Sequence, residues 1–179
     1  MEHILLCGRR RSGRSAMIRR LLEGISAPVF GYETGTLGTR PDGYHEIYLY
    51  PYGQEESPRR EENHAADCNS RDRVIRPAVF DGPGVACLNA RKDGILVMDE
   101  IGFLESEAEE FCKTVLRKLD GELPIQAAVR EGMETDFLLR VKAHPSARVI
   151  RMEPERFDEI YEELAPVVSR WEQIIKEMQ

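Results

Sequence analysis

One stretch near the start of the chain constrains its fold more than any other segment. Residues 4–7 are apolar, residues 16–22 carry apolar side chains at helical spacing, and between them lies the run GRRRSGRS, from Gly8 to Ser15. Four residues separate its two glycines, so a strand can turn into a helix whose first N–H groups converge on an anion. The spacing is that of a phosphate-binding P-loop, G-x-x-x-x-G-K-[ST], with Arg14 in the place of lysine. The segment therefore predicts a degenerate Walker A motif in an α/β protein.

The composition is that of a single globular domain. The 179 residues are enough for one domain, 1–179, with a sizeable core, and 41% hydrophobic with 32% charged residues is typical of such a protein. The longest apolar runs are too short to cross a bilayer, and no secretory segment follows Met1. The four scattered cysteines include no C-x-x-C pair, which favours reduced thiols. We therefore expect a cytoplasmic protein without a membrane partner.

The charge balance bears on the possible partners. A net charge of −7 disfavours wholesale binding to a nucleic-acid backbone, which relies on a dense basic face. The basic turn from Arg9 to Arg11 leaves a local contact with RNA or with another phosphate open. No pattern in the sequence identifies a protein partner.

Strand and helix patterns alternate along the rest of the chain. Strand patterns occupy residues 2–7, 28–32, 46–50, 74–80, 94–100, 124–129 and 147–150. Helical patterns occupy 14–23, 85–90, the stretch from the capping box at 106–109 to Gly121, and 134–141. The alternation predicts a mostly parallel sheet flanked by helices. The two strands on either side of the turn-rich stretch 35–43 predict a β-hairpin insertion.

The polar stretch 53–73 is almost without large apolar residues. It predicts a flexible loop within the domain. His64, Asp67 and Cys68 are metal-ligand types, but they lack a second ligand pair at the spacing of a structural site, which favours a solvated loop.

Two helix boundaries are also predicted from local signals. Ser106 and Glu109 form a capping box that opens a helix. Near the C-terminus, Pro166 is predicted to divide the apolar stripe 157–178 into two helices.

The catalytic candidates follow from a second, independent signal. The apolar run 94–98 ends in Asp99 and Glu100, as expected of a buried parallel strand whose acids lie at the C-terminal edge of the sheet. A nucleoside triphosphate needs a cation near its β- and γ-phosphates, and a hydroxyl and an acid on the side of Mg²⁺. Arg14 is the predicted cation, Ser15 and Asp99 are the predicted magnesium-side residues, and Glu100 is the predicted base for an attacking water. The predicted nucleotide-binding residues of the loop are Gly8, Arg9, Arg10, Arg11, Ser12, Gly13, Arg14, Ser15 and Ala16.

Several stretches together resemble a known family. The segment from Ile95 to Glu105, ILVMDEIGFLE, resembles the apolar-Asp-Glu-Ile-Gly-Lys-Met-Glu segment of the small nucleoside-triphosphatase family that includes the cancer-related nucleoside triphosphatase. Phe103 stands where that family has lysine. The run 30–34, FGYET, is similar to its Gly-Phe-x-Thr stretch, and the run 40–44, RPDGY, is similar to its Arg-x-Gly-Phe with one residue inserted.

The resemblance covers most of the chain and is weak over 53–73. It implies a RecA-like parallel sheet and hydrolysis of nucleoside triphosphates with broad base specificity. It also implies a nucleotide-side role for Arg156, which stands where the family commonly has Asn-Arg-Asp, although a surface ion pair is an equally good interpretation.

Two residues of the loop depart from the family pattern. The guanidinium of Arg14 is planar and longer than the lysine ammonium that usually fits inside the loop. Arg11 replaces a glycine, and a positive φ at that position would cost an arginine roughly 1–2 kcal/mol. The leading hypothesis is slow Mg²⁺-dependent hydrolysis of ATP, GTP and related nucleotides to NDP and phosphate. A nucleotide- or phosphate-binding module without turnover is the alternative, and a nucleotide kinase is a third.

Overall fold

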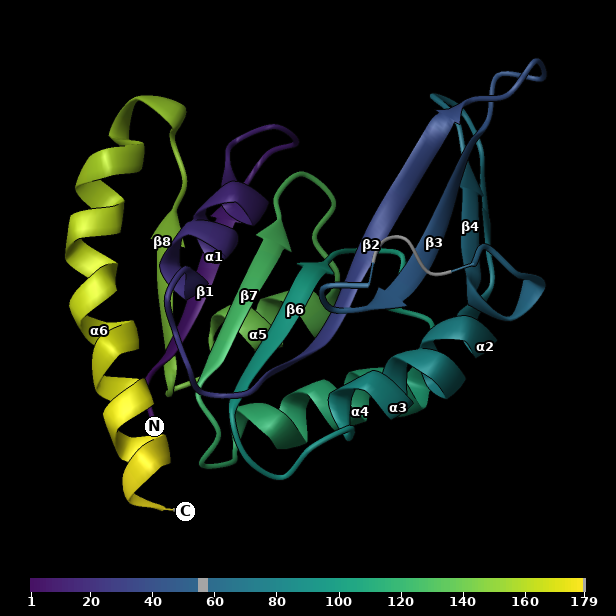
Figure 1. Ribbon diagram of the computed structural model, residues 1–179. Coiled ribbons are helices and arrows are strands. Elements are labelled where there is room, and N and C mark those ends of the chain that lie inside the picture. The colour runs from purple at the N-terminus through teal and green to yellow at the C-terminus, as the bar shows by residue number, and fades with distance from the viewer. Residues whose placement is uncertain (55–57, 179) are drawn as a thin grey trace.

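A computed structural model describes residues 1–54 and 58–178 and contains an eight-stranded sheet (Figure 1). The strand order is β5-β4-β3-β2-β6-β7-β1-β8. The strands are β1 (His3–Gly8), β2 (Val29–Thr39), β3 (His45–Pro51), β4 (His64–Cys68), β5 (Arg73–Ile75), β6 (Ile95–Ile101), β7 (Ile125–Arg130) and β8 (Ala147–Arg151). Because β1 lies between β7 and the edge strand β8, the loop that follows it opens one strand in from the parallel edge of the sheet.

The sheet has a parallel half and an antiparallel half that meet at β2. Strands β2, β6, β7, β1 and β8 pair in parallel, whereas β3, β4 and β5 are added in antiparallel fashion. Strand β2 is long enough to pair with β6 over residues 29–33 and with β3 over residues 32–39. At Gly31 a Cβ would lie 1.9 Å from the carbonyl oxygen of Val97, so β2 approaches β6 here in a way that only glycine allows. Figure 1 shows β2, β3 and β4 rising beside the parallel strands as a separate limb, which we call the extension.

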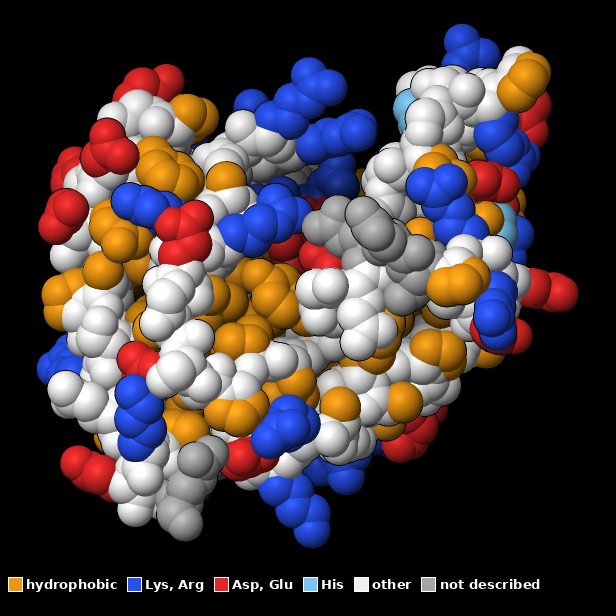
Figure 2. Space-filling view, in the orientation of Figure 1, with side chains coloured by type: hydrophobic (Ala, Val, Ile, Leu, Met, Phe, Trp, Pro, Cys, Tyr) orange, Lys and Arg blue, Asp and Glu red, His pale blue; other side chains and the backbone are white. Residues whose placement is uncertain are grey.

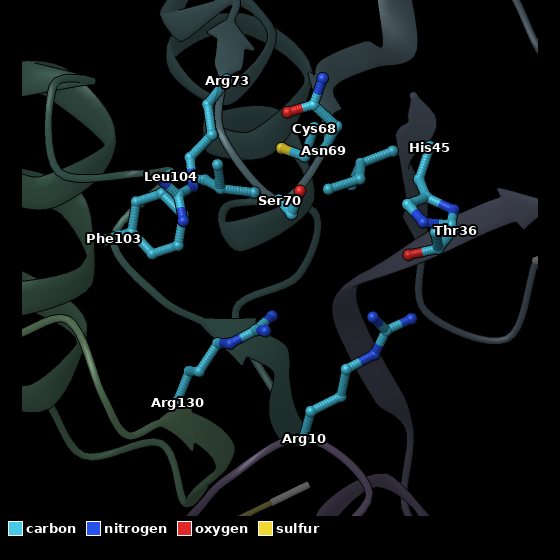
Figure 3. A pocket seen from close by; sticks show the side chains of 11 residues that line it. Arg10, Thr36, His45, Cys68, Asn69, Ser70, Arg73, Phe103, Leu104 and Arg130 are labelled. Atoms are coloured by element: carbon cyan, nitrogen blue, oxygen red, sulfur yellow. The ribbon is translucent and has the colours of Figure 1, made fainter. Parts of the chain in front are cut away.

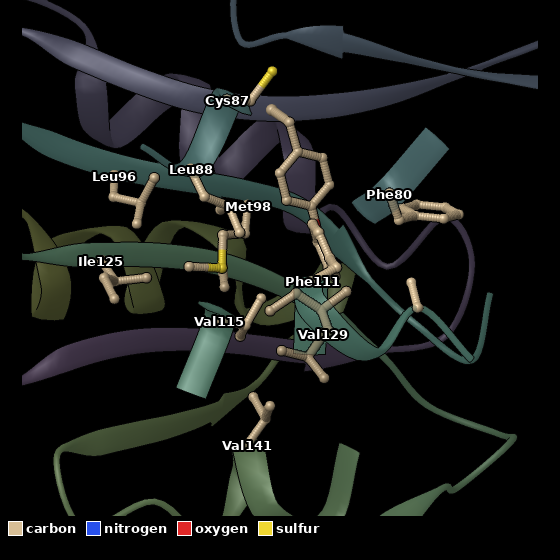
Figure 4. Packing of buried hydrophobic residues seen from close by; sticks show 14 of the residues in the cluster. Phe80, Cys87, Leu88, Leu96, Met98, Phe111, Val115, Ile125, Val129 and Val141 are labelled. Atoms are coloured by element: carbon tan, nitrogen blue, oxygen red, sulfur yellow. The ribbon is translucent and has the colours of Figure 1, made fainter. Parts of the chain in front are cut away.

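Helices cover both faces of the parallel half, and each face has its own apolar core (Figure 1). The helices are α1 (Arg14–Leu22), α2 (Pro77–Val79), α3 (Val85–Leu88), α4 (Glu109–Leu119), α5 (Asp136–Lys142) and α6 (Phe157–Glu177), with short turns η1 (Glu61–Asn63), η2 (Phe80–Gly84) and η3 (Pro154–Arg156). Helices α1 and α6 cover one face, where Met17, Leu164 and Trp171 pack on Ile4 and Val97. Helices α3, α4 and α5 cover the other, where Leu88, Phe111 and Val141 pack against Leu96, Met98 and Val129 (Figure 4).

The mostly parallel sheet, its flanking helices and the β-hairpin are confirmed. The apolar run 95–98 is fully buried between the two cores, which is why it reads as a continuous hydrophobic segment and not as an alternating one. None of the described helices combines the length and the apolar character that a membrane-spanning helix requires.

The flexible loop predicted over 53–73 is wrong for residues 61–68. Residues 61–63 form η1, and 64–68 form β4, which joins the sheet between β3 and β5; residues 55–57 lie outside the described residues. The segment is ordered because small side chains fill the core position and the polar ones are paired. Ala65 and Ala66 are fully buried, and Asp67 accepts hydrogen bonds from Arg40 and Arg76. Hydropathy cannot reveal an ion-paired strand of this kind.

Three local predictions are also wrong. Pro166 lies inside the single helix α6, whose apolar stripe on the sheet outweighs the hydrogen bond that proline removes. The strand predicted over 74–80 ends at Ile75, and Pro77 occupies the first position of α2. Helix α4 begins at Glu109 with Ala108 as its N-cap, while the hydroxyl of Ser106 bonds that of Thr135 instead, 2.8 Å away.

Candidate functional site

The loop between β1 and α1 has the tight backbone that its glycines predict. A Cβ at Gly8 would lie 2.4 Å from the side-chain oxygen of Ser12, so the chain can fold back here only without a side chain. Gly13 has φ 90° and is the N-cap of α1. The first N–H groups of α1 therefore point into the concave side of the loop, as an anion site requires.

Arg11 stands where the resembled family has glycine, and its backbone conformation decides how much free energy this replacement costs. Its φ is 62°, in the left-handed region, and it has this conformation alone among the described residues other than glycine. An arginine in this conformation loses about 1–2 kcal/mol relative to the right-handed region. The loop therefore keeps its shape at a conformational cost.

Ser15 and Asp99 meet as the sequence predicts. The hydroxyl of Ser15 in α1 donates to Oδ1 of Asp99 over 2.9 Å, although β7 lies between β6 and β1. The residue of β7 level with Asp99 is Ala128, whose small side chain leaves this path open. Burial raises the pKa of Asp99, and the hydrogen bond from Ser15 opposes that shift. The two oxygens are hard donors of the kind that Mg²⁺ prefers.

Arg14 lies beneath the loop and does not point out to solvent. Only 6% of its side chain is exposed, and its Nη2 lies 2.8 Å from Oε2 of Glu100. Its Nε and Nη1 are buried and have no hydrogen-bond partner within the described part of the chain. Buried donors of a charged group are costly to leave unpaired. Arg14 thus links the loop to the predicted base, and two of its buried donors remain unpaired among the described residues.

Arg130 is the residue that the sequence analysis did not identify. It ends β7, level with Gly8 of the neighbouring strand, and its Nη1 lies 3.1 Å from Oε1 of Glu100. The two carboxylate oxygens of Glu100 are therefore held by two different arginines. The only sequence signal was the position of Arg130 at the C-terminal end of a predicted parallel strand.

Glu105 is a second buried carboxyl close to this site. Its side chain is 2% exposed and accepts the N–H of Gly102 over 2.8 Å. Burial raises its pKa to about 8, and the nearby charge of Glu100 adds to that shift. The raised pKa favours the protonated form of Glu105, which lies beside an ion-paired Glu100.

The remaining predicted residues lie at the rim. Arg9, Arg10, Arg11 and Ala16 are exposed on the loop and the first turn of α1, and Figure 2 shows Lys and Arg side chains gathered there beside the hollow that separates the main body from the extension. Arg156 forms an exposed ion pair with Glu159, 2.7 Å apart, one of the two interpretations of the sequence. The next residue, Phe157, would lie 3.5 Å from a Cβ at Gly13, so η3 is close to the loop.

The metal-ligand types of β4 form an ion-pair network. Ligand atoms of Glu46, His64 and Asp67 lie within 4.8 Å of one another. However, the two oxygens of Asp67 already accept hydrogen bonds from Arg40 at 3.1 Å and from Arg76 at 2.8 Å. Two cations at this distance oppose a third, so the cluster does not suit a metal ion.

Comparison with known proteins gives a consistent result. A family model described as NTPase matches residues 3–165. A curated relative, the nucleoside-triphosphatase THEP1 of Methanothermobacter thermautotrophicus, is 28% identical over 170 residues, which cover 88% of this chain and 91% of that protein. The crystal structure of THEP1 from the hyperthermophile Aquifex aeolicus superposes with a TM-score of 0.69 at 16% identity, covering 94% of this chain and 99% of that one. That likeness shows the same α/β fold.

Proposed function

The chain belongs to the NTPase family, and from that premise we propose that it hydrolyses nucleoside triphosphates to nucleoside diphosphate and phosphate, slowly and with broad base specificity that includes ATP and GTP. One observation carries the proposal. Ser15 of the loop lies 2.9 Å from Asp99, and in the same place Arg14 joins Glu100 over 2.8 Å. The phosphate-binding loop and the two predicted acids therefore form one site.

Binding of the triphosphate uses groups that have no other partner. The N–H groups at the start of α1 face the loop, and the buried Nε and Nη1 of Arg14 are unpaired donors close to it. A guanidinium donates along two edges, so Arg14 can keep Oε2 of Glu100 while it donates to a phosphate oxygen. We infer that this double role explains how arginine replaces lysine in the loop.

Mg²⁺ is the cofactor that fits the residues present. Ser15 Oγ and Asp99 Oδ1 would hold it, and both are oxygen donors at the edge of the loop. When bound with the nucleotide, the ion neutralises negative charge on the phosphates. The four described cysteines are free thiols, in keeping with the cytoplasmic location that we propose.

Glu100 is the proposed base. A water hydrogen-bonded to its carboxylate attacks the γ-phosphorus, its proton passes to Glu100, and the bond to the β–γ bridging oxygen breaks to release the diphosphate. Arg14 and Arg130 fix the carboxylate from two sides, at 2.8 and 3.1 Å, and so set its direction before the nucleotide binds.

The test is phosphate release from ATP and GTP by the purified chain. We expect Glu100→Gln to lower the rate about 10²–10⁴-fold, the usual contribution of a positioned base. Nucleotide binding, measured with a fluorescent analogue, should remain within a few-fold because glutamine keeps the size of the side chain. Equal rates in the two proteins would overturn the assignment of the base.

A binding module without turnover is the second candidate, and the Arg14–Glu100 ion pair is what favours it. That contact occupies one oxygen of the predicted base. Arg14→Lys separates the two candidates, because lysine keeps the charge but cannot contact phosphate and Glu100 along two edges. A fall in rate supports hydrolysis by an arginine-adapted loop. Thermal stabilisation by nucleotide without phosphate release from the natural chain supports the binding module.

A further inference from the structure

A cavity of about 320 Å³ lies between the loop and the extension, outside the residues assigned above to nucleotide hydrolysis except at its rim. Its walls come from the loop after β1, the β2–β3 hairpin, the turn between β4 and β5, and the segment after β6. The size is in the range of pockets that hold one small organic molecule. The extension continues the sheet beyond β2, and the cavity lies between it and the loop after β1.

Three arginines converge on this cavity from separate elements. Figure 3 shows Arg10 and Arg130 on one side of the hollow and Arg73 on the other. Among the described residues that line it none is acidic, although the chain as a whole has 32 acidic and only 25 basic residues. Such a concentration of one sign against the trend of the chain marks a site for an anion.

Two of these arginines have no carboxylate partner. Within the described ranges, neither Arg10 nor Arg73 forms an ion pair, whereas Arg130 is held by Glu100 at 3.1 Å. The guanidinium carbon of Arg73 lies over the ring of Phe103, 4.7 Å from its centroid, and this cation–π contact helps to hold the guanidinium in place. A preoriented fork is the donor that phosphate oxygens match in pairs.

The other walls suit a sugar or a base more than an inorganic ion. Thr36, Asn69 and Ser70 are uncharged hydrogen-bonding residues, and Phe103 offers an aromatic surface. A narrower cavity of about 50 Å³ continues inward, sharing Thr36, Phe103 and Arg130 with the first and reaching Glu100 and Glu105. A molecule in the larger cavity would therefore lie beside Glu100, the proposed catalytic base, and outside the concave side of the loop.

We propose that this cavity, defined by Arg10, Arg73, Arg130 and Phe103, binds a second ligand that carries a phosphate monoester, of nucleoside monophosphate or sugar phosphate size. The location beside the triphosphate rests on the proposed function, whereas the affinity for the phosphate ester rests on the three arginines. This ligand and the nucleotide in the loop bind at the same time, next to each other, and neither displaces the other.

The experiment is a calorimetric titration of the full chain, loaded with saturating ADP and Mg²⁺ so that the loop is occupied. AMP, ribose 5-phosphate and adenosine are titrated separately. We expect one equivalent of AMP to bind and adenosine not to bind. Binding of ribose 5-phosphate at similar strength identifies the phosphate sugar as the ligand, and binding of AMP alone identifies the nucleotide.

Arg73→Ala is the variant that tests the cavity, and Arg71→Ala is its matched control, because Arg71 is an exposed arginine two residues away that does not line the cavity. Loss of one charge-assisted phosphate contact should weaken AMP binding about tenfold or more, with Arg71→Ala unchanged. Thermal unfolding of both variants checks that they fold. Equal effects of the two variants, no AMP binding, or equal binding of adenosine would overturn the proposal.

Two further outcomes separate this inference from its alternatives. A single-stranded oligonucleotide that binds far more tightly than AMP would replace the small ligand by a nucleic acid. Arg73-dependent AMP binding in a protein that releases no phosphate from ATP would refute the proposed hydrolysis alone. Hydrolysis dependent on Glu100 without any AMP binding would refute the cavity ligand alone.

Discussion

Two buried carboxyl groups, one in each half of the sheet, contrast the ways in which the halves are stabilised. Glu105, beside the parallel half, is buried, and burial raises its pKa to about 8. Asp67, in the extension, is also buried, yet hydrogen bonds from Arg76 and the charge of His64 outweigh burial and lower its pKa. Burial thus dominates the pKa of Glu105, whereas ion pairing dominates the pKa of Asp67.

The same contrast applies to the residues that form the strands. In β6 four successive apolar side chains are fully buried. In β4 the buried residues are two alanines and an aspartate, which bury little apolar area. Apolar burial is therefore the main stabilising contribution in the parallel half, and ion pairing compensates for its shortage in the extension.

The largest expected effect is in the parallel half. Leu96→Ala leaves a cavity in a fully buried layer and should lower the free energy of unfolding by about 2–5 kcal/mol. Urea unfolding followed by circular dichroism measures it. A loss below 1 kcal/mol would show that the packed core is not what stabilises this half.

The second effect is a dependence of stability on pH from Glu105. In the folded state the Glu105 carboxyl keeps its proton up to a pKa of about 8, whereas in the unfolded chain it loses the proton near the ordinary value of 4.5. The free energy of unfolding therefore falls as the pH rises between these values. The slope is at most about 1.4 kcal/mol per pH unit. Unfolding measured from pH 5 to pH 8 should show this fall, and Glu105→Gln should reduce it. A slope that survives the substitution would place its origin elsewhere.

The third effect is in the extension. Asp67→Ala removes the acceptor of Arg40 and Arg76, which are about one-third exposed, so the loss should be about 1–2 kcal/mol and not the larger cost of a fully buried pair. Hydrogen exchange should report it as faster exchange in β4 and β5, with the parallel strands unchanged. Equal acceleration in both halves would mean that the sheet unfolds as one unit.

The smallest effect concerns the loop. Arg11→Gly removes the strain of a positive φ at 62° and should raise stability by about 1 kcal/mol, less the entropy that glycine adds to the unfolded chain. The melting temperature measures the balance. A lower melting temperature would show that the side chain of Arg11 stabilises the loop by more than its conformation costs.

Much of the parallel half was predictable, because its signals are local. The apolar run before Asp99 and the glycine spacing before Ser15 each mark a strand end, and parallel strands bring such ends to one edge. The structure brings Ser15 and Asp99 to 2.9 Å of each other at that edge. The contact between Arg14 and Glu100 could not be predicted in this way, because the direction of a side chain depends on the packing around it.

The extension and its cavity were not predictable for a different reason. Asp67, Arg40 and Arg76 come from three separate segments, and their pairing depends on strand register. A polar sequence of this kind has the composition of a loop whether or not its charges find partners. The role of Arg130 was hidden in the same way, because it needs the register that sets this residue level with Gly8.

Strand β2 belongs to both halves at once, and this has a mechanical consequence. Residues 29–33 are bonded to β6, residues 32–39 are bonded to β3, and the hydroxyl of Tyr32 donates to the backbone oxygen of Glu100 over 3.0 Å. A force on the extension is therefore transmitted along one continuous strand to the backbone of the proposed base. Separating them requires hydrogen bonds of these two ladders to break, so β2 couples the extension to the backbone of the proposed base.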